Sequence, residues 1–309
     1  MNGNTIFIGG TGRSGTTLLS RILEANGLDR FEYELRFFTD PHGVLDLRKR
    51  LTDDWDPYWS HDAISRFVTF YKKFLQFNLY AYHRTRLNTL PKTENIKILD
   101  GFLKELRVIP EKRMWIGNSN YLLRLLYAKK VSSVRKLFPN FYQCPTLSHK
   151  EFDEAFRSMW DKLTREYEAP YNVEHTPYNF LYHQGLKAVL PGSKFITLVR
   201  NPFDIISSYA SKEWGSHDLN VNADQIISLF TKFLDSETEG LIIKMEDIVN
   251  DAEAINQRLT EYLGVSINVN ESNLVSRSAA NMNRSKEQVK NLDKGKVKIL
   301  GSIAEKLGY

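Results

Sequence analysis

A turn near the start of the chain carries residue types that bind anions. It spans residues 10–17 with the sequence GTGRSGTT and follows a short apolar run at residues 6–8. After the turn, apolar residues recur at helical spacing up to Gly27, a typical C-terminal helix cap: Leu18, Leu19, Ile22 and Leu23. The turn should therefore join the end of a strand to the N-terminus of a helix. There, free backbone N–H groups and the positive end of the helix dipole favour an anion.

The glycines of this turn resemble the P-loop pattern Gly-x4-Gly-Lys-Ser/Thr. Gly10 and Gly15 have that spacing, but Thr16 stands where nucleotide-hydrolysing families keep the lysine that reaches the β and γ phosphates. A cation is present inside the loop instead, at Arg13. The pattern favours a phosphate-like ligand and counts against an ATPase. The alternative, a glycine turn without a ligand, is weakened by the polar residues that accompany the glycines.

A second group of polar residues follows the apolar run at residues 194–199. Such a near-continuous run is typical of a buried parallel strand. Arg200 comes directly after it, Pro202 suits the first turn of a following helix, and Ser208 lies on the second turn of that helix. A guanidinium offers paired, charge-assisted hydrogen bonds to a phosphate, and a hydroxyl can fix the orientation of that phosphate. An apolar strand followed by Arg-Asn-Pro is unremarkable by itself, and its value lies in the presence of the Arg13 loop in the same chain.

Both groups together resemble the donor site of sulfotransferases that use 3′-phosphoadenosine 5′-phosphosulfate (PAPS). The segment FIGG-x-x-RSGTTL is similar to tyrosylprotein sulfotransferases and to bacterial sulfotransferases. The resemblance implies that the 3′-phosphate of PAPS binds Arg200 and Ser208. It also implies that the loop holds the 5′-phosphosulfate, with these residues: Arg13, Ser14, Gly15, Thr16 and Thr17. Sulfuryl donors have no γ-phosphate and these enzymes use no metal, which agrees with the missing lysine.

The same resemblance implies candidate catalytic residues, of which the loop cation Arg13 is one. In that family a Glu-x-Arg element follows the first helix, and its glutamate is the catalytic base. The family's spacing places this base at Glu34, with Arg36 two residues later and Glu32 as a neighbouring candidate. Glu34 would take the proton of an acceptor hydroxyl; the alternative is a solvated glutamate on a strand edge.

A histidine stands where the family often has a leaving-group lysine. Members often carry Lys-x-Pro where this chain has His-Thr-Pro at residues 175–177. His175 would have to stabilise the leaving-group oxygen as a cation or as a neutral donor. The alternative is a histidine satisfied by local hydrogen bonds.

The resemblance implies a P-loop-like, three-layer α/β/α fold with a central parallel sheet and ligands at the carboxyl ends of its strands. The 309 residues fit one sulfotransferase domain over residues 1–309, long enough to bury about three quarters of its unfolded surface. Further along the chain, residues 242–248 resemble the strand and acidic turn of the family, and we expect a helix at residues 252–263 that ends at Gly264.

Residues 40–170 have a different pattern and are interpreted as a helical insertion that shapes the acceptor pocket. Helical periods occur at residues 64–75 and 121–126, and Ser148 with Glu151 predicts a capping box for a helix through residue 168. The one strand expected here is at residues 95–100. Many aromatic residues could stack on a sugar or aromatic acceptor, although helical spacing favours a core role for most: Trp55, Tyr58, Trp59, Phe67, Phe70, Tyr71, Phe74, Phe77, Tyr80 and Tyr82.

Composition narrows the possible partners. The chain has 42 Lys and Arg against 37 Asp and Glu, a mild positive excess that suits anionic ligands. No long basic block or recognition motif indicates nucleic acid. Cys144 is the single cysteine, which excludes an intramolecular disulfide and suits a reducing compartment. Because no apolar run approaches a membrane span and the first strand starts too early for a signal sequence, we expect a cytoplasmic protein.

The resemblance implies an enzyme that moves a sulfuryl group from PAPS to a hydroxyl acceptor and releases adenosine 3′,5′-bisphosphate without a metal. The acceptor stays open among carbohydrates, lipids, small molecules and peptide tyrosine. Two alternatives remain: a P-loop kinase for a small molecule, and a non-catalytic protein that binds a nucleotide or sugar. A late loop in related enzymes packs over the donor, and the candidates here are Arg277, Arg284, Ser285 and Lys286.

Overall fold

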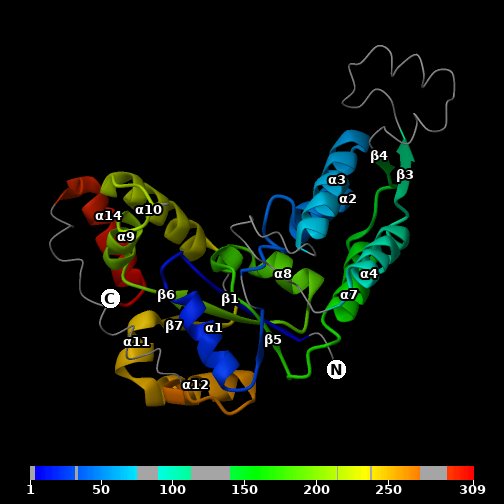
Figure 1. The fold of residues 1–309 in the computed structure, drawn as a ribbon. Coiled ribbons are helices and arrows are strands. Elements are labelled where there is room, and N and C mark those ends of the chain that lie inside the picture. Colours follow the sequence, from blue (N-terminus) through cyan, green and yellow to red (C-terminus); the bar gives the residue numbers. More distant parts are fainter. Residues whose placement is uncertain are drawn as a thin grey trace. The chain divides into compact units, whose positions relative to one another are not determined.

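The chain divides into two compact units. The computed structural model describes residues 4–31, 34–74, 90–112, 140–213, 215–236, 239–271 and 291–309. One unit combines Met1–Leu35 with Tyr167–Tyr309, and the other is Arg36–Glu166. We call them the sheet unit and the helical unit; Figure 1 labels their helices and strands.

The sheet unit is built on five parallel strands in the order β2-β5-β1-β6-β7. Their bounds are Thr5–Gly10 for β1, Asp29–Arg30 for β2, Asn172–Glu174 for β5, Lys194–Val199 for β6 and Leu241–Lys244 for β7. β1 lies in the middle, and its last residue, Gly10, is in register with Leu198 of β6. This register brings the carboxyl ends of β1 and β6 together. The predicted α/β fold with a central parallel sheet is confirmed.

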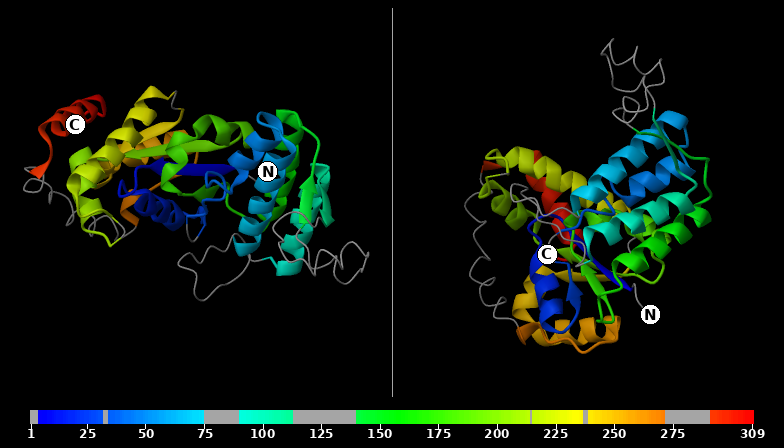
Figure 2. Two further views of the ribbon diagram at one scale, coloured as in Figure 1. Left: turned by 90° about the horizontal axis from the view of Figure 1, so that it is seen from above. Right: turned by 45° about the vertical axis from the view of Figure 1, so that its right-hand side comes forward.

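Helices cover both faces of this sheet (Figures 1 and 2). On one face, Ile6 and Ile8 of β1 pack in a core cluster with the first group of helices: α1 (Thr16–Ala25), α11 (Met245–Asn250) and α12 (Ala252–Leu263). On the other face, Phe7 stacks on Phe195 with ring centroids 5.7 Å apart. That face carries η1 (Pro177–Leu181), α8 (His183–Val189), α9 (Pro202–Ala210), α10 (Leu219–Asp235) and α14 (Lys294–Lys306). The alternation along β1 thus produces the three-layer arrangement.

Most predicted boundaries in this unit agree with the structure. The predicted strand at residues 194–199 is β6, and α12 ends at Gly264, which adopts φ 74° as a left-handed cap. By sequence, Pro177 suits the first turn of one helix that would carry Phe180, Leu181 and Leu186. Instead, a 3₁₀ helix ends at Leu181 and α8 begins at His183, because Tyr182 between them leaves the helical conformation at φ −126° and ψ 21°.

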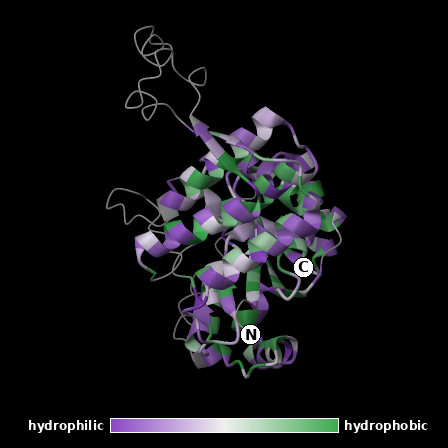
Figure 3. Cartoon of the chain, turned by 90° about the vertical axis from the view of Figure 1, so that its right-hand side faces the viewer, coloured by the Kyte–Doolittle hydropathy of each residue, from purple (hydrophilic) through white to green (hydrophobic). Residues whose placement is uncertain are grey.

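The helical unit has an aromatic core. Its helices are α2 (Val44–Thr52), α3 (Pro57–Phe74), α4 (Lys92–Glu105) and α7 (His149–Leu163), and its hairpin is β3 (Ile109–Lys112) with β4 (Asn140–Gln143). The rings of Phe37, Phe38 and Trp160 pack together, with Phe38 and Trp160 edge to face at 4.9 Å. Figure 3 shows hydrophilic and hydrophobic residues alternating along the helices, as expected where one face of a helix is buried.

Two predicted elements of this unit can be compared with the structure, and a third lies outside the described residues. The capping box of Ser148 and Glu151 is confirmed, although its helix ends at Leu163 rather than at residue 168. The strand expected at residues 95–100 is wrong, because these residues lie within α4. The short run alternates like a strand, but the longer buried series has helical spacing: Asn95, Ile98, Leu99 and Phe102. The helix expected at residues 121–126 lies outside the described residues.

The predicted insertion at residues 40–170 overlaps the helical unit. Some of its aromatic side chains are buried and others are exposed. Phe67 and Tyr71 are fully buried and belong to the core. Trp55, Tyr58 and Trp59 are exposed by 40%, 61% and 55%. Phe70 is partly buried, and the side chains of Phe74, Phe77, Tyr80 and Tyr82 lie outside the described part of the chain. Among the aromatic side chains that the structure describes, the exposed ones are the most accessible to a ligand. In the described part of the chain, no helix combines the length and the apolar content needed to cross a membrane.

Candidate functional site

The loop between β1 and α1 has two positions, Gly10 and Gly15, at which the structure leaves no room for a side chain. A Cβ atom at Gly10 would collide with Ser14 Oγ and with the backbone oxygen of Leu198. Gly15 adopts φ 99°, in the left-handed region, and a Cβ atom there would collide with Met245 Sδ. Arg13 also has a positive φ, of 69°, although it is not glycine. The loop is therefore held in one close turn between the strand and the helix.

Polar groups inside this loop are buried without protein partners. Thr11 Oγ1 and Ser14 Oγ find no hydrogen-bond partner among the described residues, although both residues are fully buried. The N-terminus of α1 has Gly15 at its N-cap position, no side-chain cap and no acidic residue in its first turn. Because buried hydroxyls and free helix N–H groups are costly to leave unsatisfied, the loop has the donors that an anion requires.

Arg200 and Ser208 meet this loop. Arg200 Nη1 donates to the backbone oxygen of Arg13 at 3.1 Å, and Arg13 Nε donates to Ser208 Oγ at 3.0 Å. Arg200 Nε is buried and has no hydrogen-bond partner among the described residues. The parallel pairing of β1 with β6 explains the meeting, because both arginines follow neighbouring strand ends. Three residues that the sequence predicted as donor contacts are therefore brought together.

The charges in this cluster have the same sign. Burial, followed by the charge of Arg200, lowers the pKa of Arg13, and Tyr209 partly opposes this effect. A guanidinium stays charged at neutral pH despite such a shift. Two neighbouring cations repel each other, and an anion bound between them would remove that repulsion. The electrostatics of the cluster therefore favour a negatively charged ligand.

The turn after Arg200 is held by hydrogen bonds that involve Glu246, Tyr309 and Asn201. The backbone N–H of Asn201 donates to Glu246 Oε1 at 3.2 Å, and Tyr309 Oη donates to Glu246 Oε2 at 2.6 Å. Asn201 Oδ1 accepts from the N–H of Phe203 at 3.0 Å and so caps α9. Glu246 thereby orients the strand end that carries Arg200. No periodicity or motif in the sequence indicates a contact from Tyr309.

Glu34 lies beside the carboxyl end of β5 and is partly buried. The N–H of Phe31 donates to the oxygen of Val173 at 3.1 Å, which continues the pairing of β2 with β5. The N–H of Leu35 donates to Glu174 Oε1 at 3.2 Å. Glu34 is thus placed at the same edge of the sheet as the loop, where the parallel strands end. Its role as a base stays a prediction.

His175 is buried in its neutral form. It is 2% exposed, and its Nδ1 has no hydrogen-bond partner among the described residues. Burial, together with the charges of Arg30 and Arg21, lowers the pKa of His175 to about 4. Of the two ways in which it could stabilise a leaving group, the cationic one is therefore disfavoured at neutral pH. A neutral N–H donor remains.

Lowering the pH from 7 to 5 is expected to reduce the free energy of unfolding through His175. The pKa of His175 is about 4 in the folded chain and about 6.5 in the unfolded chain. At a pH between these two values the unfolded chain binds a proton that the folded chain does not, so the free energy of unfolding decreases as the pH is lowered. By pH 5 the loss is on the order of 2 kcal/mol. Urea unfolding of the wild type and His175→Gln at both pH values measures it. Equal losses in both proteins would contradict this assignment.

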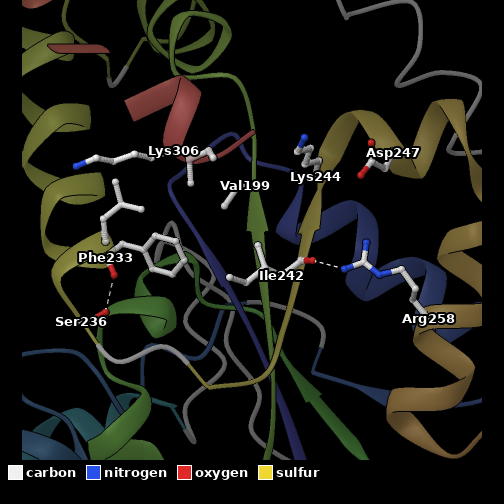
Figure 4. Close-up of a pocket in the computed structure, with 10 residues that line it drawn as sticks. Val199, Phe233, Ser236, Ile242, Lys244, Asp247, Arg258 and Lys306 are labelled. Carbon is white, nitrogen blue, oxygen red and sulfur yellow. Dashed lines mark hydrogen bonds between the residues drawn. The ribbon is translucent and has the colours of Figure 1, made fainter. Parts of the chain in front are cut away.

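A separate pocket of about 290 Å³ lies along β7, the edge strand of the sheet (Figure 4). Figure 4 shows Ile242 between Phe233 on one side and Arg258 on the other. Arg258 Nη2 donates to the backbone oxygen of Ile242 at 2.7 Å and so covers part of the exposed strand edge. The lining includes neither Arg200 nor Ser208. This pocket is therefore distinct from the cluster at the loop.

Two further points of the sequence analysis concern the late donor loop and a metal site. The candidates for a late donor loop, Arg277, Arg284, Ser285 and Lys286, lie outside the described residues. Within the described residues, no group of three or more His, Cys, Asp and Glu side chains is placed to hold a metal ion.

Comparison with known proteins gives the family. A family model described as "Sulfotransferase family" matches residues 5–269, which include the loop, Arg200 and Ser208. The sulfotransferase domain of the Synechococcus PCC 7002 olefin synthase is similar over 100% of this chain and 96% of its own, with 15% identity and a TM-score of 0.47. Sulfotransferase STF9 from Mycobacterium avium is similar over 99% of this chain and 76% of its own, with 12% identity and a TM-score of 0.44. No curated protein sequence matches this chain significantly. Because the family model spans well over half of the chain, this protein belongs to the sulfotransferase family.

Proposed function

We propose that this protein transfers the sulfuryl group of PAPS to the hydroxyl of an acceptor and releases adenosine 3′,5′-bisphosphate. The observation that carries the proposal is the meeting of Arg13, Arg200 and Ser208 at the carboxyl ends of two neighbouring strands. Family membership supports sulfotransferase activity, and the two arginines support a donor that has more than one anionic group.

The residues at this site fit PAPS as a substrate. Thr11 Oγ1, Ser14 Oγ and Arg200 Nε are buried polar atoms without partners among the described residues, so a ligand with several phosphate or sulfate oxygens would satisfy them. We assign the 5′-phosphosulfate to the loop from Arg13 to Thr17 and the N-terminus of α1. We assign the 3′-phosphate to Arg200 and Ser208.

Chemistry at this site depends on positioning and on neutralising charge. The acceptor oxygen attacks sulfur, the bond from sulfur to the phosphate oxygen breaks, and the electron pair of that bond leaves with the bisphosphate. Arg13 and the loop N–H groups stabilise the charge that develops on the leaving oxygen. Glu34 takes the proton of the acceptor hydroxyl. His175 is neutral and buried, so it acts either as a neutral hydrogen-bond donor or as a structural residue.

We assign acceptor recognition to the helical unit. Its exposed aromatic side chains, Trp55, Tyr58 and Trp59, have the flat apolar faces that stack on a sugar or an aromatic ring. The guanidinium of Arg50 lies 4.9 Å from the centre of the Trp59 ring. Carbohydrates and phenols are accordingly the acceptor classes to try first.

Adenosine 3′,5′-bisphosphate should raise the melting temperature without magnesium. A ligand present at 100 times its dissociation constant adds about 2.7 kcal/mol of stability. The measurement is a thermal-shift titration with this bisphosphate beside ADP and ATP, each with and without magnesium. Selective, metal-independent stabilisation by the bisphosphate supports the donor assignment. Stabilisation by ATP with magnesium alone would favour a kinase, and no stabilisation by any of them would contradict the proposal.

A further inference from the structure

The carboxylate of Glu174 lies at the end of β5 and collects hydrogen bonds from three segments of the chain. The residue is 1% exposed. Its Oε1 accepts from the N–H of Leu35 at 3.2 Å, from the N–H of Thr176 at 3.1 Å and from Thr176 Oγ1 at 2.5 Å. Its Oε2 accepts from Asn179 Nδ2. Burial raises the pKa of Glu174, and the hydrogen bonds oppose this rise.

These bonds connect the candidate base to the strand that carries the anion loop. Leu35 directly follows Glu34, and its N–H is held by Glu174. Asn179, which also contacts Glu174, belongs to η1, and its Nδ2 lies 3.4 Å from the backbone oxygen of Ile8 in β1. The backbone of Phe180 packs so closely on Gly9 of β1 that a Cβ atom there would collide with it. A continuous set of contacts therefore runs from Glu34 through Glu174 to β1.

Glu174 itself is not placed to act on a substrate. Its side chain is enclosed, and both of its oxygens are already occupied by donors of the protein. A buried carboxylate held by neutral donors is costly, so a hydrophobic residue of similar size would be the cheaper way to fill this space. What the carboxylate provides instead is a fixed position for Leu35, whose own side chain is 1% exposed.

We propose that Glu174 is a positioning residue that sets the place of Glu34 by holding the N–H of Leu35. This inference rests on the proposed function, because it needs Glu34 as the base. Without the bond, the N–H of Leu35 would be left buried and unsatisfied, and the segment would move to find another partner. A displacement of about 1 Å at a reacting group can cost about 10²-fold in rate.

Glu174→Asp is the most informative substitution. Shortening the side chain by one methylene withdraws the carboxylate from Leu35, whereas an aspartate can still accept from the N–H two residues on, that of Thr176. Glu174→Gln is the conservative variant, because its amide oxygen can keep the bond to Leu35. Its new N–H₂ can donate to Asn179 Oδ1, which has no partner among the described residues.

The test measures turnover of PAPS with p-nitrophenol, N-acetylglucosamine or a tyrosine peptide as probe acceptor, the affinity for adenosine 3′,5′-bisphosphate, and hydrogen exchange at Leu35. We expect Glu174→Asp to lower kcat by about tenfold to 10²-fold, to speed exchange at Leu35 and to change bisphosphate affinity by less than about threefold. Glu174→Gln should keep kcat within about threefold of the wild type. In a Glu34→Gln background, Glu174→Asp should cost nothing further, because a residue that acts only through Glu34 has nothing left to position.

The outcomes separate this inference from the proposed function. An equal loss from Glu174→Asp in both backgrounds, or a loss of bisphosphate affinity as large as the loss of kcat, would show a purely structural role and overturn the inference. Wild-type exchange at Leu35 in Glu174→Asp would also overturn it. Full turnover in Glu34→Gln would show that Glu34 is not the base and would overturn this inference, whereas the proposed PAPS-dependent activity would be unaffected. No turnover with any probe acceptor and no bisphosphate binding would overturn the proposed function.

Discussion

Glu34→Gln is expected to lower kcat by about 10²- to 10⁴-fold, the usual contribution of a positioned general base. Glutamine keeps the size and the hydrogen-bonding oxygen of glutamate but cannot take a proton from the acceptor hydroxyl. Because the assigned donor contacts come from the loop, Arg200 and Ser208, the affinity for adenosine 3′,5′-bisphosphate should change by less than about twofold. Steady-state kinetics with PAPS and isothermal titration with the bisphosphate measure the two effects separately.

The neighbouring glutamate supplies the matched control for this substitution. Glu32→Gln changes the same type of side chain two residues earlier and removes the same charge. It should leave kcat near that of the wild type, because the Glu-x-Arg element places the base at Glu34 and not at Glu32. A large loss in Glu32→Gln with full activity in Glu34→Gln would transfer the role of base to Glu32. Full activity in both variants would show that neither glutamate is the base.

Arg200→Ala is expected to weaken the binding of adenosine 3′,5′-bisphosphate by about 10²-fold or more. A hydrogen bond to a charged group contributes about 1.5–3 kcal/mol, and a guanidinium can make two of them to one phosphate. The substitution also removes the bond from Arg200 Nη1 to the backbone oxygen of Arg13, which helps to fix the loop. Isothermal titration at two salt concentrations measures the affinity and its electrostatic part.

Two variants make this test specific. Arg200→Lys keeps the charge but loses the paired geometry, so its affinity should lie between those of the wild type and Arg200→Ala. Arg258→Ala removes another arginine of the same sheet unit, one that bonds the oxygen of Ile242 on β7. Its bisphosphate affinity should stay near that of the wild type. Equal losses in Arg200→Ala and Arg258→Ala would indicate a general charge effect and contradict a phosphate contact at Arg200.

Local sequence was sufficient to predict the parts of the site that lie on regular elements. The glycines and the apolar runs on either side predicted β1, the loop and α1, and the near-continuous apolar run predicted β6 and placed Arg200 at its end. These predictions succeed because each depends on residues that are neighbours in sequence. Ser208 lies on α9, the helix that follows Arg200, and the pairing of β1 with β6 brings both residues to Arg13.

Long-range contacts could not be predicted in the same way. The hydrogen bond of Glu174 with Leu35 joins residues 139 positions apart, and no local pattern distinguishes Glu174 from a solvated glutamate. The bond of Tyr309 with Glu246 is of the same kind. The strand expected at residues 95–100 failed for another reason, because six residues are too few to separate a period of 2 from a helical period. The sequence left open whether His175 acts as a cation or as a neutral group, and its burial in the structure favours the neutral form.

The central position of β1 has a consequence for synthesis. β1 is made first, yet its two neighbours, β5 and β6, begin at Asn172 and Lys194, about 160 and 180 residues after its end. At roughly 5–20 residues per second, the ribosome needs about 8 to 40 s to supply them. During that interval the whole helical unit emerges, while an apolar strand with both edges unpaired waits on the nascent chain. The central sheet can therefore form only after the helical unit has been synthesised.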